Sequence, residues 1–268
     1  MKTTNRFFLA MAIMFLLFST TSFSQDEPKR PKYVTVTTMH WNMDNDDFEM
    51  DEWKALEKEY LDKVVRKNEF VVSASYYMHQ FTADNTELLY VQTYASWEAI
   101  DKVGKRNAEL EKEAWPDEDA RKALAKKRDA YYDLRHSDEI YATLPYAKLM
   151  AEAPTKDMTL YVRKSHFANY EDGSDEEFDN ILQMGRDKII GNNEFIKGYY
   201  PSVHAWGADK TEYIEAFIVE SVGELDKMFD RTQELIKELT DEEKAVGKNR
   251  GKYFTGVHGD YIYTYVHM

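Results

Sequence analysis

The 268-residue chain contains no cysteine. This absence excludes disulfide bonds, thiolate metal sites and a lipid-modified cysteine behind a leader sequence. Proline and glycine are sparse, at six and 11 residues, and no long apolar run follows residue 18. A chain of this length can still bury a substantial core without covalent cross-links.

Basic residues are also fewer than acidic ones, with 35 Lys and Arg against 49 Asp and Glu residues. Without Lys2 and Arg6, which belong to the leader described next, 33 basic and 49 acidic residues remain, a net charge of −16. Such a surface repels phosphate backbones and anionic lipids. We therefore expect no nucleic-acid partner, and no membrane partner once the leader is removed.

The N-terminus has the pattern of a secretory signal peptide. A basic start is followed by an apolar run over residues 7–18, and Ser22 and Ser24 place small residues before a cut at Gln25. The run is too short for a transmembrane anchor. We expect residues 1–24 to be a signal peptide, and the protein to be secreted or periplasmic and soluble.

The rest of the chain contains an internal similarity. MHQFTADNTELLY at 78–90 aligns with VHAWGADKTEYIE at 203–215, an offset of 125 residues. The similarity extends in both directions and predicts one unit at 33–144, a connector at 145–158 and a second unit at 159–268.

Each unit shows the same succession of patterns: strand, helix, strand, strand, helix, strand. Apolar residues with a 3.6-residue period mark the helices, and β-branched or aromatic runs mark the strands. Ser174-x-x-Glu177 and Ser221-x-x-Glu224 have the pattern of capping boxes. The order is that of a ferredoxin-like βαββαβ unit, so the fold class is α+β. The expected strands span 33–41, 70–81, 87–94 and 138–144, and 159–167, 195–206, 212–219 and 260–266.

The third strand of each unit has two distinct faces. We expect the aliphatic face, with Leu89 and Ile214, to pack on helices. The alternate face is aromatic and semi-polar, and must be buried against something. We expect it to meet the same face of the other unit and to form an apolar-aromatic cavity between two four-stranded sheets. The residues expected to line this cavity include Tyr90, Tyr94, Tyr161, Tyr213 and Phe217.

On this element order, the hairpin-plus-helix pattern and the internal similarity, the chain resembles the dimeric α+β barrel superfamily. Its members include antibiotic-biosynthesis monooxygenases, NIPSNAP-like proteins, and the haem-binding chlorite dismutases and dye-decolorising peroxidases. The resemblance implies that two ferredoxin-like repeats close one barrel within a single polypeptide, as a monomer with an internal pseudo-two-fold axis. The alternative is two independent domains on a linker. No catalytic signature accompanies the resemblance.

Six of the seven histidines pair between the units. In a βαββαβ unit the ends of strands one and two and the start of strand four lie at one end of the sheet, so each unit gathers its three histidines there. They could form a metal site or an acid–base cluster. We favour histidines that cap loops, and expect no metal. The pairs are His40 with His166, His79 with His204, and His136 with His258.

The haem-binding groups of the superfamily use a proximal histidine, and the resemblance offers only His136 and His258 as counterparts. The haem-degrading members place Asn, Trp and His around haem. The consecutive His40-Trp41-Asn42 does not match that dispersed arrangement, so those roles are not transferred. The sequence leaves the cofactor undetermined.

Arg163 and Glu215 occupy adjacent central strands on the expected interior face. The favoured interpretation is a buried ion pair. The alternative is that Arg163 binds an acidic ligand in the aromatic cavity. The first unit has Thr37 and Tyr90 at these positions, so we expect the second unit to supply the polar groups of any single site.

Two functions remain open at this level. The first is a binding protein that holds a small aromatic or acidic molecule between its two sheets. The second is a barrel-type monooxygenase or a haem-dependent redox enzyme, and the sequence leaves open whether the protein is an enzyme. The candidate ligand-binding residues are Arg163, Glu215, Tyr90, Tyr94, Tyr161, Tyr213, His79, His204, His136 and His258.

Overall fold

The computed structural model describes residues 30–170 and 172–268. The expected signal peptide lies outside these residues. Residues 31–268 form one compact unit. Within the described ranges, no helix combines the length and the apolar composition that a membrane crossing requires.

Eight strands make up the sheet, four from each half of the chain. The predicted strands at 33–41, 87–94 and 212–219 are confirmed at both ends. The last strand of each half begins six residues earlier than predicted. The strands are β1 (Tyr33–Trp41), β2 (Ser73–Phe81), β3 (Glu87–Tyr94), β4 (Tyr132–Thr143), β5 (Met158–Phe167), β6 (Gly198–Trp206), β7 (Glu212–Val219) and β8 (Phe254–Val266).

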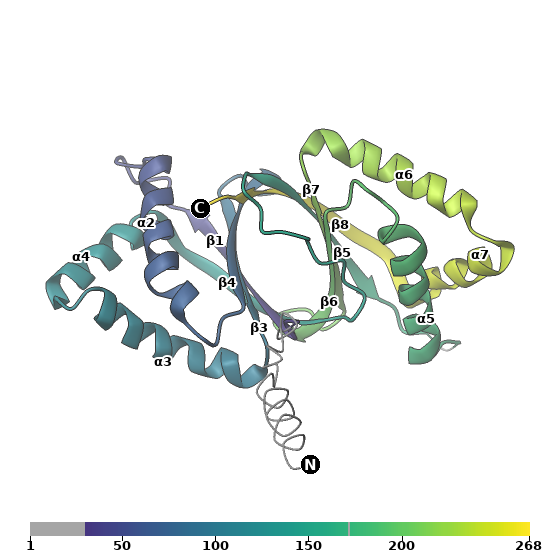
Figure 1. Cartoon of the computed structure of the whole chain (residues 1–268), viewed down its shortest axis with the longest axis horizontal. Helices are drawn as coiled ribbons and strands as arrows, with labels where there is room; N and C mark the ends of the chain where they lie inside the picture. Colours follow the sequence, from purple (N-terminus) through teal and green to yellow (C-terminus); the bar gives the residue numbers. More distant parts are fainter. Residues whose placement is uncertain (1–29, 171) are drawn as a thin grey trace, which may run out of the picture. The chain divides into compact units, whose positions relative to one another are not determined.

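The helices lie outside this sheet, three longer ones in each half (Figure 1). Those of the first half are α2 (Met50–Lys63), the 3-10 turn η1 (Val65–Lys67), α3 (Trp97–Ala114) and α4 (Glu118–Asp129). Those of the second half are α5 (Asp175–Gly185), the π-helical turn η2 (Arg186–Ile190), the 3-10 turn η3 (Val222–Glu224), α6 (Leu225–Glu238), α7 (Asp241–Lys248) and the 3-10 turn η4 (Asn249–Tyr253).

The strands close into a single barrel in the order β1-β3-β2-β8-β5-β7-β6-β4. Each half contributes four consecutive strands, and every neighbouring pair is antiparallel. The halves join at two places, where β2 pairs with β8 and β4 pairs with β6. Two ferredoxin-like units therefore form one intramolecular α+β barrel, as predicted. The two junctions join the predicted four-stranded sheets into one closed sheet.

Local hydrogen bonds explain where several helices begin. Ser96 Oγ accepts from the Ala99 N–H at 3.2 Å, and Ser174 Oγ accepts from the Glu177 N–H at 3.1 Å. The capping box predicted at Ser221 does not form, because the chain makes the turn η3 there and the Ser221 side chain caps nothing. A complete capping box occurs at Thr240 instead.

The predicted assignment of the two sheet faces was inverted. One buried cluster combines aliphatic residues of both halves and lies inside the barrel. Tyr90, Tyr161 and Tyr213, which were expected inside, pack in the clusters beneath the helices. The interior of an eight-stranded barrel is just wide enough for side chains to fill it, and here it also holds the rings of Tyr141 and Tyr263. The buried interior residues are Leu89, Tyr141, Met158, Leu160, Val162, Ile214, Ile218 and Tyr263.

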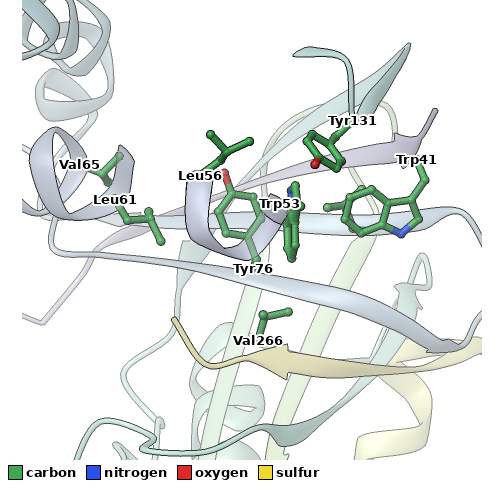
Figure 2. Packing of buried hydrophobic residues seen from close by; sticks show 9 residues of the cluster. Trp41, Trp53, Leu56, Leu61, Val65, Tyr76, Tyr131 and Val266 are labelled. Carbon is green, nitrogen blue, oxygen red and sulfur yellow. The ribbon is translucent and has the colours of Figure 1, made fainter. Parts of the chain in front are cut away.

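The core between sheet and helices in the first half is dominated by aromatic rings (Figure 2). Trp53 of α2 is fully buried and meets Trp41 of β1 edge-on, with ring centroids 4.9 Å apart. Trp53 also contacts Tyr76 of β2 at 5.5 Å. Val266 of β8 belongs to the same cluster, so the second half contributes to the core of the first.

Candidate functional site

The two junctions between the halves differ. We call the β2–β8 junction the open seam and the β4–β6 junction the closed seam. A depression of about 460 Å³ lies at the open seam, near Phe81, the last β2 residue paired with β8. Its wall consists of residues 79–83 from the first half and 259–261 from the second. The site is therefore built from both halves.

His79 stands at the end of β2, in a fixed orientation. The Thr82 hydroxyl donates its proton to the Asp84 carbonyl at 2.8 Å. Because that proton is already used, Thr82 Oγ1 accepts from His79 Nδ1 at 2.7 Å. The neutral imidazole then carries its proton on Nδ1, and Nε2 is a free acceptor. Among the described residues, His79 Nε2 has no hydrogen-bond partner.

Asp260 of β8 is the acidic group of the site. It accepts from Tyr161 Oη at 2.6 Å and from Arg163 Nε at 2.9 Å. Burial works to raise the pKa of Asp260, but the hydrogen bonds from Arg163 and Tyr161 outweigh it and lower the pKa. The carboxylate therefore stays ionised and forms an ion pair with the adjacent guanidinium, and both side chains remain about two-fifths exposed.

Two aromatic rings give the depression its apolar character. Phe81 is 61% exposed, although a residue of this kind is normally buried. Tyr261 follows Asp260 on β8, and the Lys164 Nζ lies 5.9 Å from the centre of its ring. The site therefore combines rings for stacking, a hydrogen-bond acceptor on His79 and nearby positive charge.

A side chain occupies the equivalent space at the closed seam. The pairing Ile140↔Trp206 there corresponds to Ile262↔Phe81 at the open seam, so Glu139 occupies the position of Tyr261. The Ala208 N–H lies 3.3 and 3.4 Å from the two Glu139 carboxylate oxygens. A Cβ on Gly207 would fall 1.5 Å from Glu139 Oε2, so the carboxylate lies directly against the hairpin.

A second, much smaller cavity of about 50 Å³ lies among α2, α3 and α4. Its walls include Tyr60, which donates to Glu111 at 2.6 Å, and Arg128, which stacks on the Tyr60 ring at 3.6 Å. Arg128 also binds the fully buried Glu57 at 2.8 and 3.0 Å. These partners saturate the charges, so the cluster is structural and leaves little space for a ligand.

The predicted tyrosine lining is wrong in its placement. Tyr90 stacks on Tyr76 at 4.7 Å, within the helix-facing core of the first half. Tyr213 is fully buried among aromatic residues of the second half, and Tyr94 is 2% exposed. Tyr161 also faces the helices, but its hydroxyl donates a hydrogen bond to Asp260, which lines the depression. None of the four lies between the sheets.

The predicted ion pair between Arg163 and Glu215 does not form. The two residues are cross-strand neighbours in register, but Arg163 binds Asp260. Glu215 is buried and accepts from Arg250 at 2.7 Å and from Tyr199 at 2.8 Å. Glu215 therefore belongs to the helix-facing core of the second half.

The histidines lie at the predicted end of each sheet. His136 is opposite Met39 on β1, beside His40, and strand directions place His79 at the same end. Each of the three has its own nearby partner. His40 lies 3.3 Å from Asp84, and His136 lies 3.3 Å from Asp138.

The second half repeats this arrangement. His166 lies 3.1 Å from Asp209, and His258 lies 3.3 Å from Asp260. His204 Nε2 lies 3.4 Å from the Gly207 carbonyl, whereas its counterpart His79 uses Nδ1. Among the described residues, no three His, Asp or Glu side chains are grouped so that they could hold a metal ion.

The residues of this chain do not fit haem. An axial histidine must point into a pocket that encloses the macrocycle. The side chains of His136 and His258 are 58% and 43% exposed, and the Nε2 of each lies 3.3 Å from a neighbouring aspartate. Neither lines the cavities at the open seam or among α2–α4.

Sequence reasoning missed Tyr261 and Ala83, which line the depression, and Lys164, which lies beside the Tyr261 ring. The signal was present in the alignment. HSDEIY at 136–141 and HGDYIY at 258–263 differ at the position where Glu139 replaces Tyr261. That difference separates a closed seam from an open one.

Known structures were compared with this fold. A proposed monooxygenase from Fusobacterium nucleatum is 11% identical and has a TM-score of 0.53, covering 88% of this chain and 93% of its own. A mutant chlorite dismutase from Candidatus Nitrospira defluvii is 11% identical with a TM-score of 0.51, covering 88% and 91%. A proposed monooxygenase from Lactobacillus acidophilus is 8% identical with a TM-score of 0.50, covering 88% and 93%.

No family model matches the chain, and no curated protein sequence matches it. At these identities the structural likeness establishes the fold alone. The chain has the dimeric α+β barrel fold, with both ferredoxin-like units in one polypeptide.

Proposed function

We propose that the protein binds a small aromatic molecule in the open seam. The observation that carries this proposal is the difference between the two junctions: a depression of about 460 Å³ lies at the open seam, and the Glu139 carboxylate lies against the hairpin at the closed seam. A volume of this size suits a ligand of one or two rings. The site differs from the predicted cavity, since it lies at the junction of the halves, where Tyr261 also packs against the interior cluster.

Phe81 and Tyr261 support an aromatic ligand, because they offer ring surface at an exposed edge. His79 supports a ligand with a hydroxyl donor, because its free Nε2 can accept a proton or a hydrogen bond. We further propose that binding takes place outside the cytoplasm, after removal of residues 1–24. Fractionation of cells that express the full chain tests this location, and full-length protein retained in the cytoplasm would contradict it.

Titration calorimetry with phenol, 4-hydroxybenzoate and indole-3-acetate tests binding. We expect Tyr261→Ala and Phe81→Ala to weaken it, by up to about tenfold for each lost stacking contact. Trp206→Ala is the matched control, because Trp206 is the exposed aromatic residue at the closed seam. An equal loss in the Trp206 variant, or no binding by any of the three compounds, contradicts the proposal.

Monooxygenation is the second candidate function, and the free Nε2 of His79 favours it. This nitrogen can take a proton from an acidic group of a bound, electron-rich aromatic ligand. With molecular oxygen as co-substrate, a ring methylene becomes a carbonyl. One oxygen atom enters the ligand, and the other leaves as water with the two hydrogens. The fold shared with proposed monooxygenases is consistent with this reaction.

Oxygen consumption in the presence of a hydroxylated aromatic compound that carries a ring methylene tests the enzymatic candidate. We expect His79→Gln to abolish it while binding persists, and His204→Gln at the closed seam to leave it unchanged. Consumption that is absent in the unmodified protein, or equal in the His79 variant, contradicts a catalytic role for this histidine.

A further inference from the structure

We infer that the ligand of the open seam carries a carboxylate, which binds the Ala83 N–H. This inference rests on the proposed binding function and narrows the class of ligand. The closed seam supplies the pattern, because there the Glu139 carboxylate of the protein itself lies against the Ala208 N–H.

The open seam has the same hairpin without the acidic side chain. Ala83 is the position matched to Ala208, and its N–H has no hydrogen-bond partner among residues 30–170 and 172–268. Ala83 lines the depression, and so does Tyr261 at the position of Glu139. A hairpin donor that is satisfied by a carboxylate at one seam is therefore free at the other, beside an accessible space.

Local charge favours an anion at the open seam only. Arg163 and Lys164 on β5 neighbour β8, opposite Asp260 and Gly259. The first half has Thr37 and Thr38 at the matched positions on β1. Arg163 is paired with Asp260, and Lys164 Nζ lies 3.7 Å from Glu212 Oε1 and beside the Tyr261 ring. Lys164 is therefore the cation that the open seam adds, and the seam lacks the anion that Glu139 provides at the other junction. In a chain with an overall charge of −14, this difference makes the open seam the less negative of the two.

Thr82 distinguishes the open hairpin from the closed one, where Gly207 has φ +140°. The Thr82 hydroxyl holds the His79 ring, whereas the closed seam has no side chain at the matched position. In the inferred complex the carboxylate lies against the Ala83 N–H. A ring attached to it reaches Tyr261 and Phe81.

Pairs of ligands that differ only in charge test the inference. Benzoate is compared with benzamide, and indole-3-acetate with indole-3-acetamide, by calorimetry and by the shift of the Ala83 amide in ¹H–¹⁵N spectra. We expect each carboxylate to bind at least about tenfold more tightly than its amide, because a charged acceptor makes the stronger hydrogen bond. We also expect the affinity to fall with added salt.

Two sets of variants add to this test. Lys164→Gln is expected to weaken the carboxylates and to leave the amides unchanged, and Lys105→Gln on the exposed face of α3 is the matched control. Tyr261→Glu with Thr82→Gly transplants the closed seam into the open one. It is expected to eliminate carboxylate binding, whereas Tyr261→Gln with Thr82→Gly retains part of it. Glu139→Ala is expected to leave the affinity of the open seam unchanged.

The possible results distinguish a failure of the carboxylate site from a failure of the proposed binding function. Equal binding of carboxylate and amide overturns the carboxylate site and leaves the aromatic-ligand function standing. Binding that persists in the Tyr261→Glu, Thr82→Gly variant also overturns the carboxylate site. If neither the acids nor the amides bind the unmodified chain, the proposed function itself fails.

Discussion

The hydroxyl of Tyr141 in β4 donates a 2.6 Å hydrogen bond to Glu212 Oε2 at the start of β7. The bond joins the two halves, and a second one mirrors it, because Tyr263 of β8 donates to Glu87 at the start of β3. Each half thus gives a tyrosine to a carboxylate of the other. These reciprocal bonds complement the strand pairing that closes the barrel.

We expect Tyr141→Phe to destabilise the protein by about 1–3 kcal/mol, because it leaves Glu212 without its hydroxyl partner in a largely buried position. Urea denaturation followed by circular dichroism measures the change. Tyr33→Phe is the control, since no hydrogen bond involves the Tyr33 hydroxyl among the described residues. A loss equal to that of the control would show that the bond contributes nothing to closure.

Both halves bury one carboxylate against a matched arginine, but from different elements. In the first half Glu57 of α2 binds Arg128, and in the second half Glu215 of β7 binds Arg250. The position matched to Glu57 is Leu182, which is buried and apolar. The buried carboxylate thus lies on a helix in the first half and on a strand in the second, whereas its arginine partner is at the matched position in both.

Because the two halves place this carboxylate differently, we predict that a second substitution can restore the stability lost when Glu57 is removed. Glu57→Leu alone should cost about 3–5 kcal/mol, because Arg128 loses its partner in a mostly buried position. Adding Tyr90→Glu, at the position of Glu215, should recover at least half of that loss. Urea unfolding of the two variants and of Tyr90→Glu alone completes a double-mutant cycle. Additive effects of the two substitutions would contradict the shared role.

The fold was accessible from the sequence because its signals are periodic. Alternating and 3.6-residue patterns located the strands and helices, and the internal similarity implied two like units that close on each other. The orientation of the sheet faces was not accessible by alternation alone, since period two defines two faces without naming the inner one. A usable signal was the charge of Glu215. Its partner Arg250 lies in a helical stretch, so the sheet face that carries Glu215 must face the helices.

The candidate site was predicted less well. His79 belongs to it, and Arg163 borders it through Asp260, but the tyrosines chosen for a cavity between sheets pack under helices. The depression lies beyond Phe81, the last β2 residue paired with β8, and the closed seam has Glu139 at the position of Tyr261. Pairing between the halves brings these residues together, and no pattern within one half predicts that pairing.

The protein should lose stability at alkaline pH, because its buried tyrosines resist ionisation in the folded state. Burial is the main cause that raises the pKa of Tyr76, Tyr132 and Tyr199 well above the ordinary value of 10.0. Above pH 10 the unfolded chain releases phenolic protons that the folded chain retains. The stability from these groups is therefore complete below pH 10 and falls as pH rises further, by about 1.4 kcal/mol per pH unit for each tyrosine.

Urea midpoints measured from pH 8 to pH 11 test this dependence, with absorbance at 295 nm reporting phenolate. We expect phenolate from the buried rings to appear only together with unfolding. Tyr132→Phe should make the dependence shallower by about one proton. Ionisation of all tyrosines near pH 10 in a protein that stays folded would contradict the burial.

The closed seam should depend on the absence of a side chain at residue 207. Gly207 has φ +140°, and an added Cβ would lie 1.5 Å from the Glu139 carboxylate. Gly207→Ala therefore forces both backbone strain and displacement of Glu139, and we expect the free energy of unfolding to fall by about 1–3 kcal/mol.

Gly104→Ala is the matched control, because Gly104 lies within α3 with no neighbouring atom within 4 Å of an added Cβ. There alanine should stabilise the helix by about 0.5–1 kcal/mol. Thermal and urea unfolding measure both changes, and Glu139→Ala combined with Gly207→Ala should restore part of the loss. If the two glycine variants shift stability in the same direction, the close approach of Glu139 does not determine the closed seam.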